Sequence, residues 1–303
     1  MAGDRPTDGG RREGRSGRVR VDRLLVDRGL AASREQARRA VQEGRVRVGS
    51  QVVQRPGMRV DPGACVQVEG EAAFVSRGGR KLAHALDVLG VDVQGAVAMD
   101  VGASTGGFTD CLLQRGARKV YAVDVGYGQL AWKLRTDPRV VVMERTNVRY
   151  LEPEQLGEPL DLITVDVAFI SVTKFLCRLG RFLRDGGRLL VLVKPQFEAG
   201  RGQVGRGGVV RDDATRARVL RQVIQCAGSC GFALEGLVAS PLLGPQGNAE
   251  FFALFRWPAP PRAELPGLDG LIDEVLRQAP DRLAGAGRQT PGEGEPLRLP
   301  CGG

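Results

Sequence analysis

Five short apolar runs alternate with segments of helical length, and this alternation constrains the fold of the chain more than any other feature. The runs occupy residues 96–101, 119–124, 139–143, 160–166 and 188–194. The helix-length segments between them occupy residues 108–116, 127–135 and 171–184. Near-continuous apolar runs are typical of strands that are buried on both faces of a sheet. The alternation therefore predicts an α/β fold with a parallel, doubly wound sheet and right-handed crossovers.

The remaining segments predict the ends of this domain and a second, smaller one. A helix is expected at about 212–228, followed by strands in GFALEGLVASPL and NAEFFALFRW. A length of 303 residues favours about two domains. The expected division is a disordered tail over 1–17, a small domain over 18–70, an interdomain linker over 71–82, the α/β domain over 83–258 and a Pro/Gly-rich, largely disordered tail over 259–303. Within the last segment, LDGLIDEVL is expected to form one or two helical turns.

The small domain has the pattern of two short helices followed by β-structure. Apolar residues at helical spacing begin at Val21, and Gly29 ends this first helix. Ser33 and Gln36 form a capping-box pattern at the start of a second helix over 34–43. RVRVGSQVVQ and RVDPGACVQVEG then predict short strands. This α+β pattern, carried by RLLVDRGLAASREQARRAVQEGRVRVGSQVV, resembles the S4 RNA-binding domain, in which the basic face of the second helix and the following turn lie along RNA phosphates.

The positive charge of the chain is concentrated in the same region. Residues 1–60 contain 15 arginines and 7 acidic residues, a balance of +8 within a net charge of +9. Such an excess is typical of a surface that meets a polyanion, either nucleic acid or an acidic membrane. Arginine suits phosphate because its planar guanidinium pairs bidentately and stays charged. Together with the S4 resemblance, this predicts the RNA-binding residues Arg20, Arg23, Arg34, Arg38, Arg39, Arg45 and Arg47, with Arg77 and Arg80 in the junction.

The sharpest local motif in the α/β domain is MDVGASTGGFTD, residues 99–110. A strand ends at Asp100, and glycines then form a tight loop before a helix, so a ligand can approach backbone N–H groups there. The spacing is neither G-x-G-x-x-G nor that of a P-loop. Asp124 ends the next strand, where an acid typically accepts hydrogen bonds from ribose hydroxyls. Because dehydrogenases share that acid, these features alone leave the choice between a dehydrogenase and a methyltransferase open.

Two further polar residues follow later strands at the same predicted edge of the sheet, where open α/β sheets bind ligands. Asn147 is placed to meet an adenine edge, and Asp166 ends the fourth strand. The predicted cofactor-binding residues are Asp100, Gly102, Ser104, Thr105, Gly106, Gly107, Phe108, Asp124, Asn147 and Asp166.

Five separated motifs in order, VSRGGRKL, MDVGASTGGF, LITVDVAFIS, VKPQFEAG and GPQGNAEF, resemble the TlyA (hemolysin A) family over about residues 20–257. The resemblance implies an S4 domain ahead of an FtsJ-like, Rossmann-like methyltransferase domain. It also implies transfer of a methyl group from S-adenosyl-L-methionine to a ribose 2′-hydroxyl of ribosomal RNA, with cytidine as the acceptor. The catalytic Lys, Asp, Lys and Glu of this group fall here on Lys81, Asp166, Lys194 and Glu250.

The residues themselves agree with this catalytic set. Lys194 closes a strongly apolar run, an unusual place for a cation unless it is paired or used. Lys194, flanked by Asp166 and Glu250, would orient the ribose hydroxyl, and Lys81 would complete the network. Lysine could accept the hydroxyl proton as a neutral amine, or stay charged and stabilise a developing alkoxide; the sequence leaves both open. His84, the sole histidine, is expected to be a surface or packing residue rather than a base.

The sequence disfavours three other functions. A nucleobase methyltransferase is disfavoured because VDVAFIS stands where an N-P-P-Y-type tetrapeptide is expected. A membrane-active hemolysin would require a long apolar or strongly amphipathic segment, and none is found. An S4 binding protein with an inactive methyltransferase fold is disfavoured by the complete set of cofactor and catalytic positions.

The expected setting of the protein is the cytoplasm, because the N-terminus is polar and lacks the apolar core of a signal peptide. The six scattered cysteines are expected to be small buried thiols in a reducing compartment, and no metal site is expected. The expected partners are ribosomal RNA or ribosomal subunits, without a membrane, and a monomer is favoured.

Overall fold

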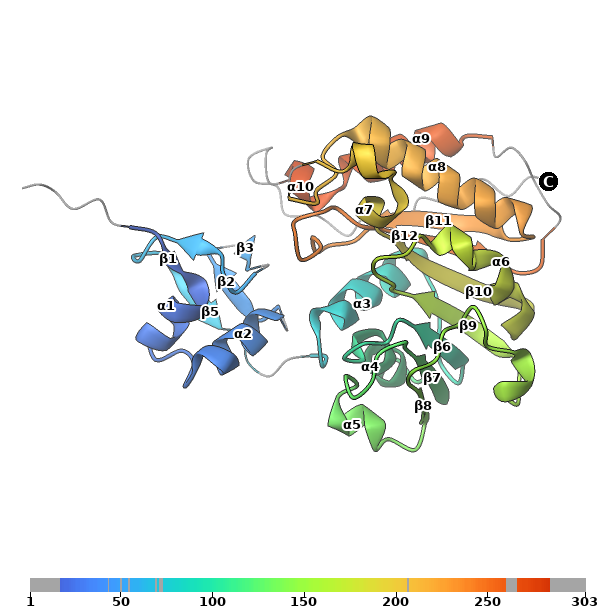
Figure 1. Cartoon of the computed structure of the whole chain (residues 1–303), viewed down its shortest axis with the longest axis horizontal. Helices are drawn as coiled ribbons and strands as arrows, with labels where there is room; N and C mark the ends of the chain where they lie inside the picture. Colours follow the sequence, from blue (N-terminus) through green and yellow to red (C-terminus); the bar gives the residue numbers. More distant parts are fainter. Residues whose placement is uncertain are drawn as a thin grey trace, which may run out of the picture. The chain divides into compact units, whose positions relative to one another are not determined.

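A computed structural model describes residues 17–42, 44–49, 51–53, 55–68, 70, 73–205, 207–259 and 266–283 (Figure 1). The chain divides between Gly70 and Glu71 into two compact units. The predictions of disorder over 1–16 and over 284–303 lie outside the described residues.

The first unit has the predicted helix pair and short strands. Its helices are α1 (Val21–Asp27) and α2 (Arg34–Gln42). Its strands are β1 (Val19–Arg20), β2 (Val46–Val48), β3 (Gln51–Val52), β4 (Arg59–Val60) and β5 (Val66–Val68). Strands β1 and β4 form a two-stranded sheet, and the other three form a sheet in the order β3-β2-β5. Ser33 Oγ accepts the N–H of Gln36 at 3.1 Å, and Gln36 Oε1 accepts the N–H of Ala32 at 2.6 Å, so reciprocal capping starts α2. Val21, Leu25 and Val41 are fully buried between the helices and strands.

The second unit is built on one seven-stranded sheet in the order β11-β12-β10-β9-β6-β7-β8. The strands are β6 (Val97–Val101), β7 (Lys119–Val123), β8 (Val140–Met143), β9 (Leu160–Val165), β10 (Leu183–Val193), β11 (Ala233–Ala239) and β12 (Phe251–Arg256). Pairing is parallel from β10 through β9, β6 and β7 to β8, and β12 is antiparallel to both of its neighbours. The predicted α/β fold, with a mostly parallel sheet and two closing strands, is confirmed.

Helices cover both faces of this sheet (Figure 1). On one face, α3 (Arg77–Leu89) and α4 (Gly107–Gln114) pack Leu86 and Leu112 against the strands. On the other face, α8 (Asp213–Ser229) and α9 (Leu268–Arg277) pack Val223 and Ile272 against them. The shorter helices are α5 (Trp132–Arg135), α6 (Leu176–Leu179), α7 (Pro195–Glu198) and α10 (Pro280–Leu283), with 3₁₀ turns η1 (Pro153–Gln155), η2 (Val172–Lys174), η3 (Gly180–Phe182) and η4 (Arg201–Gln203).

The predicted linker over 71–82 is wrong for its second half, because α3 begins at Arg77. Ser76 caps this helix by accepting the N–H of Gly78 at 3.3 Å, and Lys81 and Leu82 are already buried. The glycines that suggest a linker instead permit close packing. A Cβ atom on Gly79 would collide with the ring of Phe74, and one on Gly107 would collide with Ser76 Oγ.

The predicted tail over 259–303 is wrong for residues 266–283, which form α9 and α10. LDGLIDEVL is a full amphipathic helix whose Leu271, Ile272 and Val275 lie in the main core. The fully buried Arg216 of α8 extends this attachment, because its Nη2 pairs with Asp281 Oδ2 of α10 at 2.5 Å. The second unit therefore continues past its predicted end at residue 258.

Two predicted helices are shorter than expected. Only residues 132–135 of the segment 127–135 are α-helical, and the segment 171–184 breaks into η2, α6 and η3 before β10 begins at Leu183. Gly128 and Gly180 interrupt these segments, and the latter packs so closely on Trp257 that a Cβ atom would collide with the indole.

Within the described part of the chain, no helix has the length and apolar content needed to cross a bilayer.

Candidate active site

The register of the central strands brings the four predicted catalytic residues to one edge of the sheet. Val193 at the end of β10 pairs with Phe251 at the start of the antiparallel strand β12. Lys194, which follows Val193, and Glu250, which precedes Phe251, therefore lie at the same end of this strand pair. Asp166 follows β9, the other neighbour of β10, and its N–H donates to Val101 O of β6 at 2.9 Å. Lys81 reaches the same place from the first turns of α3.

These four side chains form two ion pairs. Lys194 Nζ lies 2.5 Å from Asp166 Oδ1, and Lys81 Nζ contacts Glu250 Oε2. The two pairs differ in exposure: the Lys194 and Asp166 side chains are 13% and 23% exposed, whereas those of Lys81 and Glu250 are 6% and 1% exposed. The Lys194–Asp166 pair is therefore the one that a substrate could reach, and the Lys81–Glu250 pair lies deeper.

Arg77 adds a third cation to this group. It lies on the same helix as Lys81, one turn before it, and is half-buried. Burial lowers the pKa of Arg77, and the charges of Glu250 and Asp166 partly offset that effect, so the guanidinium lies within electrostatic reach of both acids. Arg77, predicted from the sequence only as an RNA-binding residue, therefore also belongs to this group of charges.

The GPQGNAEF segment packs closely against the Glu250 side chain. A Cβ atom on Gly244 would collide with Glu250 Oε1, which is buried and has no hydrogen-bond partner among the described residues. The fully buried Asn248 accepts the N–H of Val210 at 2.8 Å and donates to Gly208 O at 2.8 Å. Asn248 thus fixes this turn to the segment that precedes α8, a role that the sequence alone does not reveal.

The glycine loop after β6 has a conformation that requires glycine. Gly102 and Gly106 have φ angles of +86° and +93°. A Cβ atom on Gly102 would collide with Asp166 O, and one on Gly106 would collide with Leu134. The loop therefore passes directly against the strand end that carries Asp166. Ser104 also has a positive φ, at +49°, and Phe108 is buried in the core.

Asp100 lies beneath this loop rather than at its surface. Its carboxylate is fully buried and accepts both the N–H and the Oγ1–H of Thr109, at 2.9 and 2.7 Å. Burial is the main cause that raises the pKa of Asp100 to about 7, and the negative charges of Asp166 and Asp124 also raise it. The hydrogen bonds from Thr109 lower this pKa and offset part of the increase. In this structure Asp100 holds the loop to the start of α4.

Asp124 lies in a pocket at the end of β7. The pocket is lined by Ala103, Ser104, Ala122, Asp124, Gly126, Gln129, Leu130, Val142 and Glu144. Asp124 accepts the N–H groups of Ser104 at 2.8 Å and Gly126 at 2.6 Å, so the carboxylate is fixed in place and retains free lone pairs.

This lining fits an adenosine group, because it combines the carboxylates of Asp124 and Glu144 with apolar walls at Ala103, Leu130 and Val142. Sequence reasoning missed Gln129 and Glu144. Glu144 follows β8 as Asp124 follows β7, and that shared position is the signal that could have found it. The Arg135 side chain lowers the pKa of Glu144, and the Gly128 N–H adds a hydrogen bond at 2.9 Å.

Asn147 is not among the residues that line this pocket. Its Oδ1 accepts the N–H of Arg149 at 3.0 Å and its carbonyl accepts that of Tyr150 at 2.9 Å, so it shapes its own turn. The turn is nevertheless tied to the pocket, because Thr146 N–H donates to Asp124 O at 2.9 Å.

Two aromatic side chains that the sequence does not mark as functional lie near Lys194. Phe169 is 89% exposed, has a φ of +66°, and lies 5.2 Å from the ring of Phe197, which in turn lies 6.0 Å from Lys194 Nζ. Positive φ at a bulky residue is strained, and such strain is concentrated at functional sites. Exposed Tyr127 and Tyr150 each lie beneath a guanidinium, that of Arg145 at 4.2 Å and that of Arg149 at 5.7 Å.

In the first unit, three of the predicted RNA-binding arginines surround one buried carboxylate. Asp22 is fully buried and contacts Arg20 at 2.8 Å, Arg34 at 3.4 Å and Arg38 at 3.5 Å. The hydrogen bonds from Arg20 lower the pKa of Asp22 to about 2, against the opposing effect of burial. The three arginine side chains are about half-exposed, so Asp22 gathers them while their outer N–H groups face solvent.

The other predicted arginines are distributed more widely. Arg23 pairs with Asp27 at 3.5 Å and Arg45 donates to Gly70 O at 2.9 Å. Arg39 lies in the last turn of α2 and Arg47 lies on β2. Arg80 is carried by α3 in the second unit.

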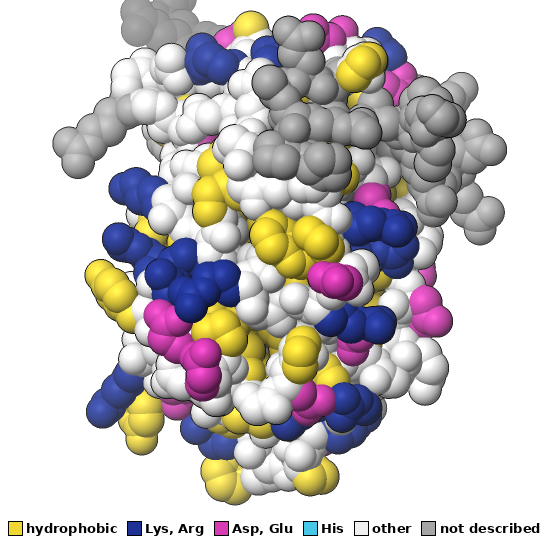
Figure 2. All heavy atoms as spheres, turned by 90° about the vertical axis from the view of Figure 1, so that its right-hand side faces the viewer, with side chains coloured by type: hydrophobic (Ala, Val, Ile, Leu, Met, Phe, Trp, Pro, Cys, Tyr) yellow, Lys and Arg dark blue, Asp and Glu magenta, His cyan; other side chains and the backbone are white. Residues whose placement is uncertain are grey.

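By contrast, one face of the molecule shows basic and acidic side chains side by side, separated by small apolar patches (Figure 2). Ion pairs such as those of Arg178 and Arg181 with Glu152, at 2.8 and 2.7 Å, are typical of an ordinary solvated surface. His84 is half-buried on α3, and burial lowers its pKa.

Comparison with known proteins identifies the family. The FtsJ-like methyltransferase model matches residues 74–257, and the S4 domain model matches residues 19–66. The chain is 45% identical over 265 residues to TlyA of Mycobacterium tuberculosis (strain CDC 1551 / Oshkosh), a 16S/23S rRNA (cytidine-2′-O)-methyltransferase, covering 87% of this chain and 99% of TlyA. The chain belongs to the TlyA family.

Two further TlyA-type relatives agree. The chain is 47% identical over 245 residues to YqxC of Bacillus subtilis, a candidate rRNA methyltransferase, covering 80% of this chain and 87% of YqxC. A solved structure of a candidate hemolysin from Streptococcus thermophilus is 40% identical and matches with a TM-score of 0.68 over 89% of this chain and 98% of that chain. The predicted TlyA-family resemblance, with its S4 and FtsJ-like parts, is therefore confirmed.

Proposed function

We propose that this TlyA-family chain transfers a methyl group from S-adenosyl-L-methionine to the ribose 2′-hydroxyl of a cytidine in ribosomal RNA. The observation that carries the proposal is the convergence of Lys81, Asp166, Lys194 and Glu250 at one edge of the sheet, beside the glycine loop. The cytidine and the ribosomal RNA come from the activity named for the Mycobacterium tuberculosis relative. Because ribosomes are assembled there, the expected location is the cytoplasm.

The cofactor would lie along the glycine loop with its adenosine in the Asp124 pocket. Asp124 would accept hydrogen bonds from the ribose hydroxyls, and Ala103, Leu130 and Val142 would enclose the base. Asp100 would act through the loop that it supports, as would Gly102, Thr105, Gly106 and Gly107 through their backbone. When bound, the cofactor supplies an electrophilic methyl group, so the protein needs chiefly to align and activate the nucleophile.

Lys194 and Asp166 would be the groups that meet the ribose hydroxyl. Lys194, held in its ion pair with Asp166, would donate a hydrogen bond to the 2′-oxygen as negative charge develops there. Asp166 fixes the direction of that ammonium, and its more exposed carboxylate can accept the hydroxyl proton. The Lys81–Glu250 pair, which is more deeply buried, would help to position Lys194 and Asp166. This assignment favours the charged-lysine alternative over the neutral amine.

RNA would be bound by both units. Arg20, Arg34 and Arg38 present guanidiniums on the first unit, together with Arg23, Arg39, Arg45 and Arg47. On the catalytic unit, the exposed ring of Phe169, which packs on Phe197 near Lys194, is a suitable platform for a base lifted out of its stack. The Tyr127–Arg145 and Tyr150–Arg149 pairs offer stacking and phosphate contacts beside the cofactor pocket.

The test is methyl transfer from labelled S-adenosyl-L-methionine to purified ribosomal subunits by the wild type and by Lys194→Ala. If Lys194 acts on the transition state, the substitution lowers turnover by roughly 10²–10⁴. Affinities for cofactor and RNA should change far less, because the lost interaction is made mainly in the transition state. Lys194→Arg should not restore turnover, since a guanidinium is bulkier than an ammonium and has a different donor geometry.

Two results would count against the proposal. Absence of transfer to either subunit by the wild type would remove the assignment of ribosomal RNA as substrate. Full turnover in a folded Lys194→Ala variant would remove the catalytic role of Lys194.

A further inference from the structure

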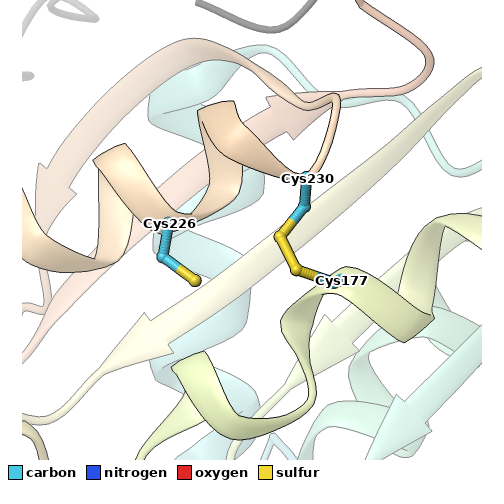
Figure 3. Close-up of side chains that lie close together, drawn as sticks. All are labelled: Cys177, Cys226 and Cys230. Atoms are coloured by element: carbon cyan, nitrogen blue, oxygen red, sulfur yellow. A yellow bond between two sulfur atoms is a disulfide. The ribbon is translucent and has the colours of Figure 1, made fainter. Parts of the chain in front are cut away.

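Three cysteines that are far apart in the sequence converge between α6 and α8 (Figure 3). Cys177 comes from α6, Cys226 from the last turns of α8, and Cys230 from the residue that ends α8. Their Sγ atoms all lie within 4.8 Å of one another. Cys177 and Cys230 are joined by a disulfide, and the Cys226 thiol points toward that pair. The prediction of small buried thiols is therefore wrong for these cysteines, because it did not anticipate that α6 meets the end of α8.

The disulfide joins the two segments that follow the catalytic strands. Asp166 follows β9, and the chain then runs through η2 into α6 and Cys177. Lys194 caps α7, and the chain then continues to α8 and Cys230. The same two segments also meet through Glu198 of α7, which accepts the Val172 N–H at 2.9 Å. A covalent bond between Cys177 and Cys230 thus crosslinks the layer that supports Asp166 and Lys194.

Exposure and distance make this cluster accessible to thiol chemistry. Cys177 is exposed, whereas Cys226 and Cys230 are half-buried, so a small oxidant reaches Cys177 first. A second thiol is then in place to react with the oxidised Cys177 sulfur. We propose that Cys177, Cys226 and Cys230 form a redox-modification site, at which a peroxide converts Cys177 and Cys230 to the disulfide and a thiol reductant reopens it.

The steps balance without any further reactant. The Cys177 thiolate attacks a peroxide oxygen, giving a sulfenic acid at Cys177 and releasing an alcohol, or water from hydrogen peroxide. The Cys230 thiolate then attacks Cys177 Sγ, forming the S–S bond and releasing water. Two thiols are oxidised by two electrons, and one peroxide is reduced. Reduction by a dithiol reverses the bond through thiol–disulfide exchange.

The geometry also predicts which cysteines can bond. Cys226 and Cys230 lie one turn apart on the same helix, where Cβ atoms are about 5–6 Å apart. A disulfide needs Cβ atoms roughly 3.5–4.5 Å apart, so these two cannot bond without unwinding the helix. Cys177, from the facing α6, is the partner for either of them. Cys226 is thus a second resolving thiol, which can take the place of Cys230.

The experiment follows the crosslink in the full-length protein by peptide mapping. Reduced protein is treated with hydrogen peroxide, remaining thiols are alkylated, and crosslinked peptides are identified by mass spectrometry. The wild type is expected to give the Cys177–Cys230 pair, Cys230→Ser the Cys177–Cys226 pair, and Cys177→Ser neither. Cys65→Ser, which removes an exposed free cysteine of the first unit, is the matched control and should behave as the wild type does.

A second measurement guards against variants that fold poorly. The disulfide closes a loop with a sequence separation of 53 residues. Oxidation of the wild type should therefore raise its unfolding midpoint by on the order of 5–10 °C, reversibly with dithiothreitol. Cys177→Ser should show no such shift. The proposal is overturned if the native wild-type thiols stay reduced under peroxide, or if the three sulfurs bind zinc or copper that protects them from alkylation.

Discussion

Asp100 illustrates how a single side chain can serve a site without facing it. The sequence places it at the end of a strand in the glycine motif, which suggests a ligand contact. Its carboxylate instead accepts two hydrogen bonds from Thr109 and is fully buried. Nothing in the local sequence distinguishes a strand-end acid that points outward from one that points under the loop. That difference depends on the direction of α4, which is a tertiary property.

The raised pKa of Asp100 predicts a pH dependence of stability. Its pKa in the folded protein is about 7, above the ordinary aspartate value of 3.8, so between these two pH values the folded state binds more protons than the unfolded state does. The stability that Asp100 contributes is fully present below about pH 4 and is lost as pH rises through 7. Asp100→Asn keeps an acceptor for Thr109 but does not titrate. The wild type should therefore lose roughly 2–3 kcal/mol relative to this variant between pH 5 and pH 8.

Urea unfolding of both proteins at pH 5 and pH 8 measures this difference. An identical pH dependence in the two proteins would show that Asp100 does not carry the raised pKa.

The convergence of Lys81, Asp166, Lys194 and Glu250 was predictable because each is tied to a strand end or to a motif, and parallel strands share an edge. Glu144 was missed although it follows β8, since no motif marked it and its role depends on the position of the 124–130 loop. Phe169 was missed because its exposure and its positive φ are what mark it as a candidate functional residue, and neither can be predicted from the residue type.

At the scale of elements, periodicity located strands better than it located helix ends. The five strand runs match β6 to β10, because burial on both faces leaves a continuous apolar signature. The start of α3 was missed because Gly78 and Gly79 resemble a linker, whereas they permit contact with Phe74 and α4. The extent of the C-terminal helices was underestimated because the surrounding segment is rich in proline and glycine.

Helix α9 should contribute directly to the stability of the catalytic unit. Ile272 is fully buried in the main core, so Ile272→Ala should lower the free energy of unfolding by about 2–5 kcal/mol through the cavity that it leaves. Asp273→Ala, at an exposed position of the same helix, should change it by only about 0.5 kcal/mol. Equal effects of the two substitutions in denaturant titrations would mean that α9 does not pack on the core as described.

At the scale of the whole molecule, the two-unit organisation was evident from the change in sequence pattern and charge near residue 70. The charge excess left nucleic acid and membrane as alternatives, and the S4 resemblance decided between them. The arrangement of Arg20, Arg34 and Arg38 around Asp22 was not predictable, because a buried acid on α1 looks like any other helical aspartate until α2 packs against it.

These arginines should govern the salt dependence of RNA binding. Arg34→Gln/Arg38→Gln removes two cations without placing new carboxylates beside Asp22. If each contacts a phosphate, the slope of log affinity against log salt should become shallower by about 1.5–2, with weaker binding at low salt. Cofactor affinity, measured by calorimetry, serves as the control and should not change. An unchanged slope in filter-binding titrations would contradict a phosphate role for this pair.

The central claim, that the acceptor is a ribose 2′-hydroxyl, is tested most directly by an alkaline cleavage ladder of ribosomal RNA methylated by the purified protein. A 2′-O-methyl group prevents the oxygen from attacking the adjacent phosphodiester, whereas a methyl group on the base leaves that hydroxyl free. One band is expected to be missing at the modified cytidine, whereas RNA treated with the Lys194→Ala variant should give a complete ladder. A complete ladder together with mass evidence for a methylated base would contradict it and support the nucleobase alternative.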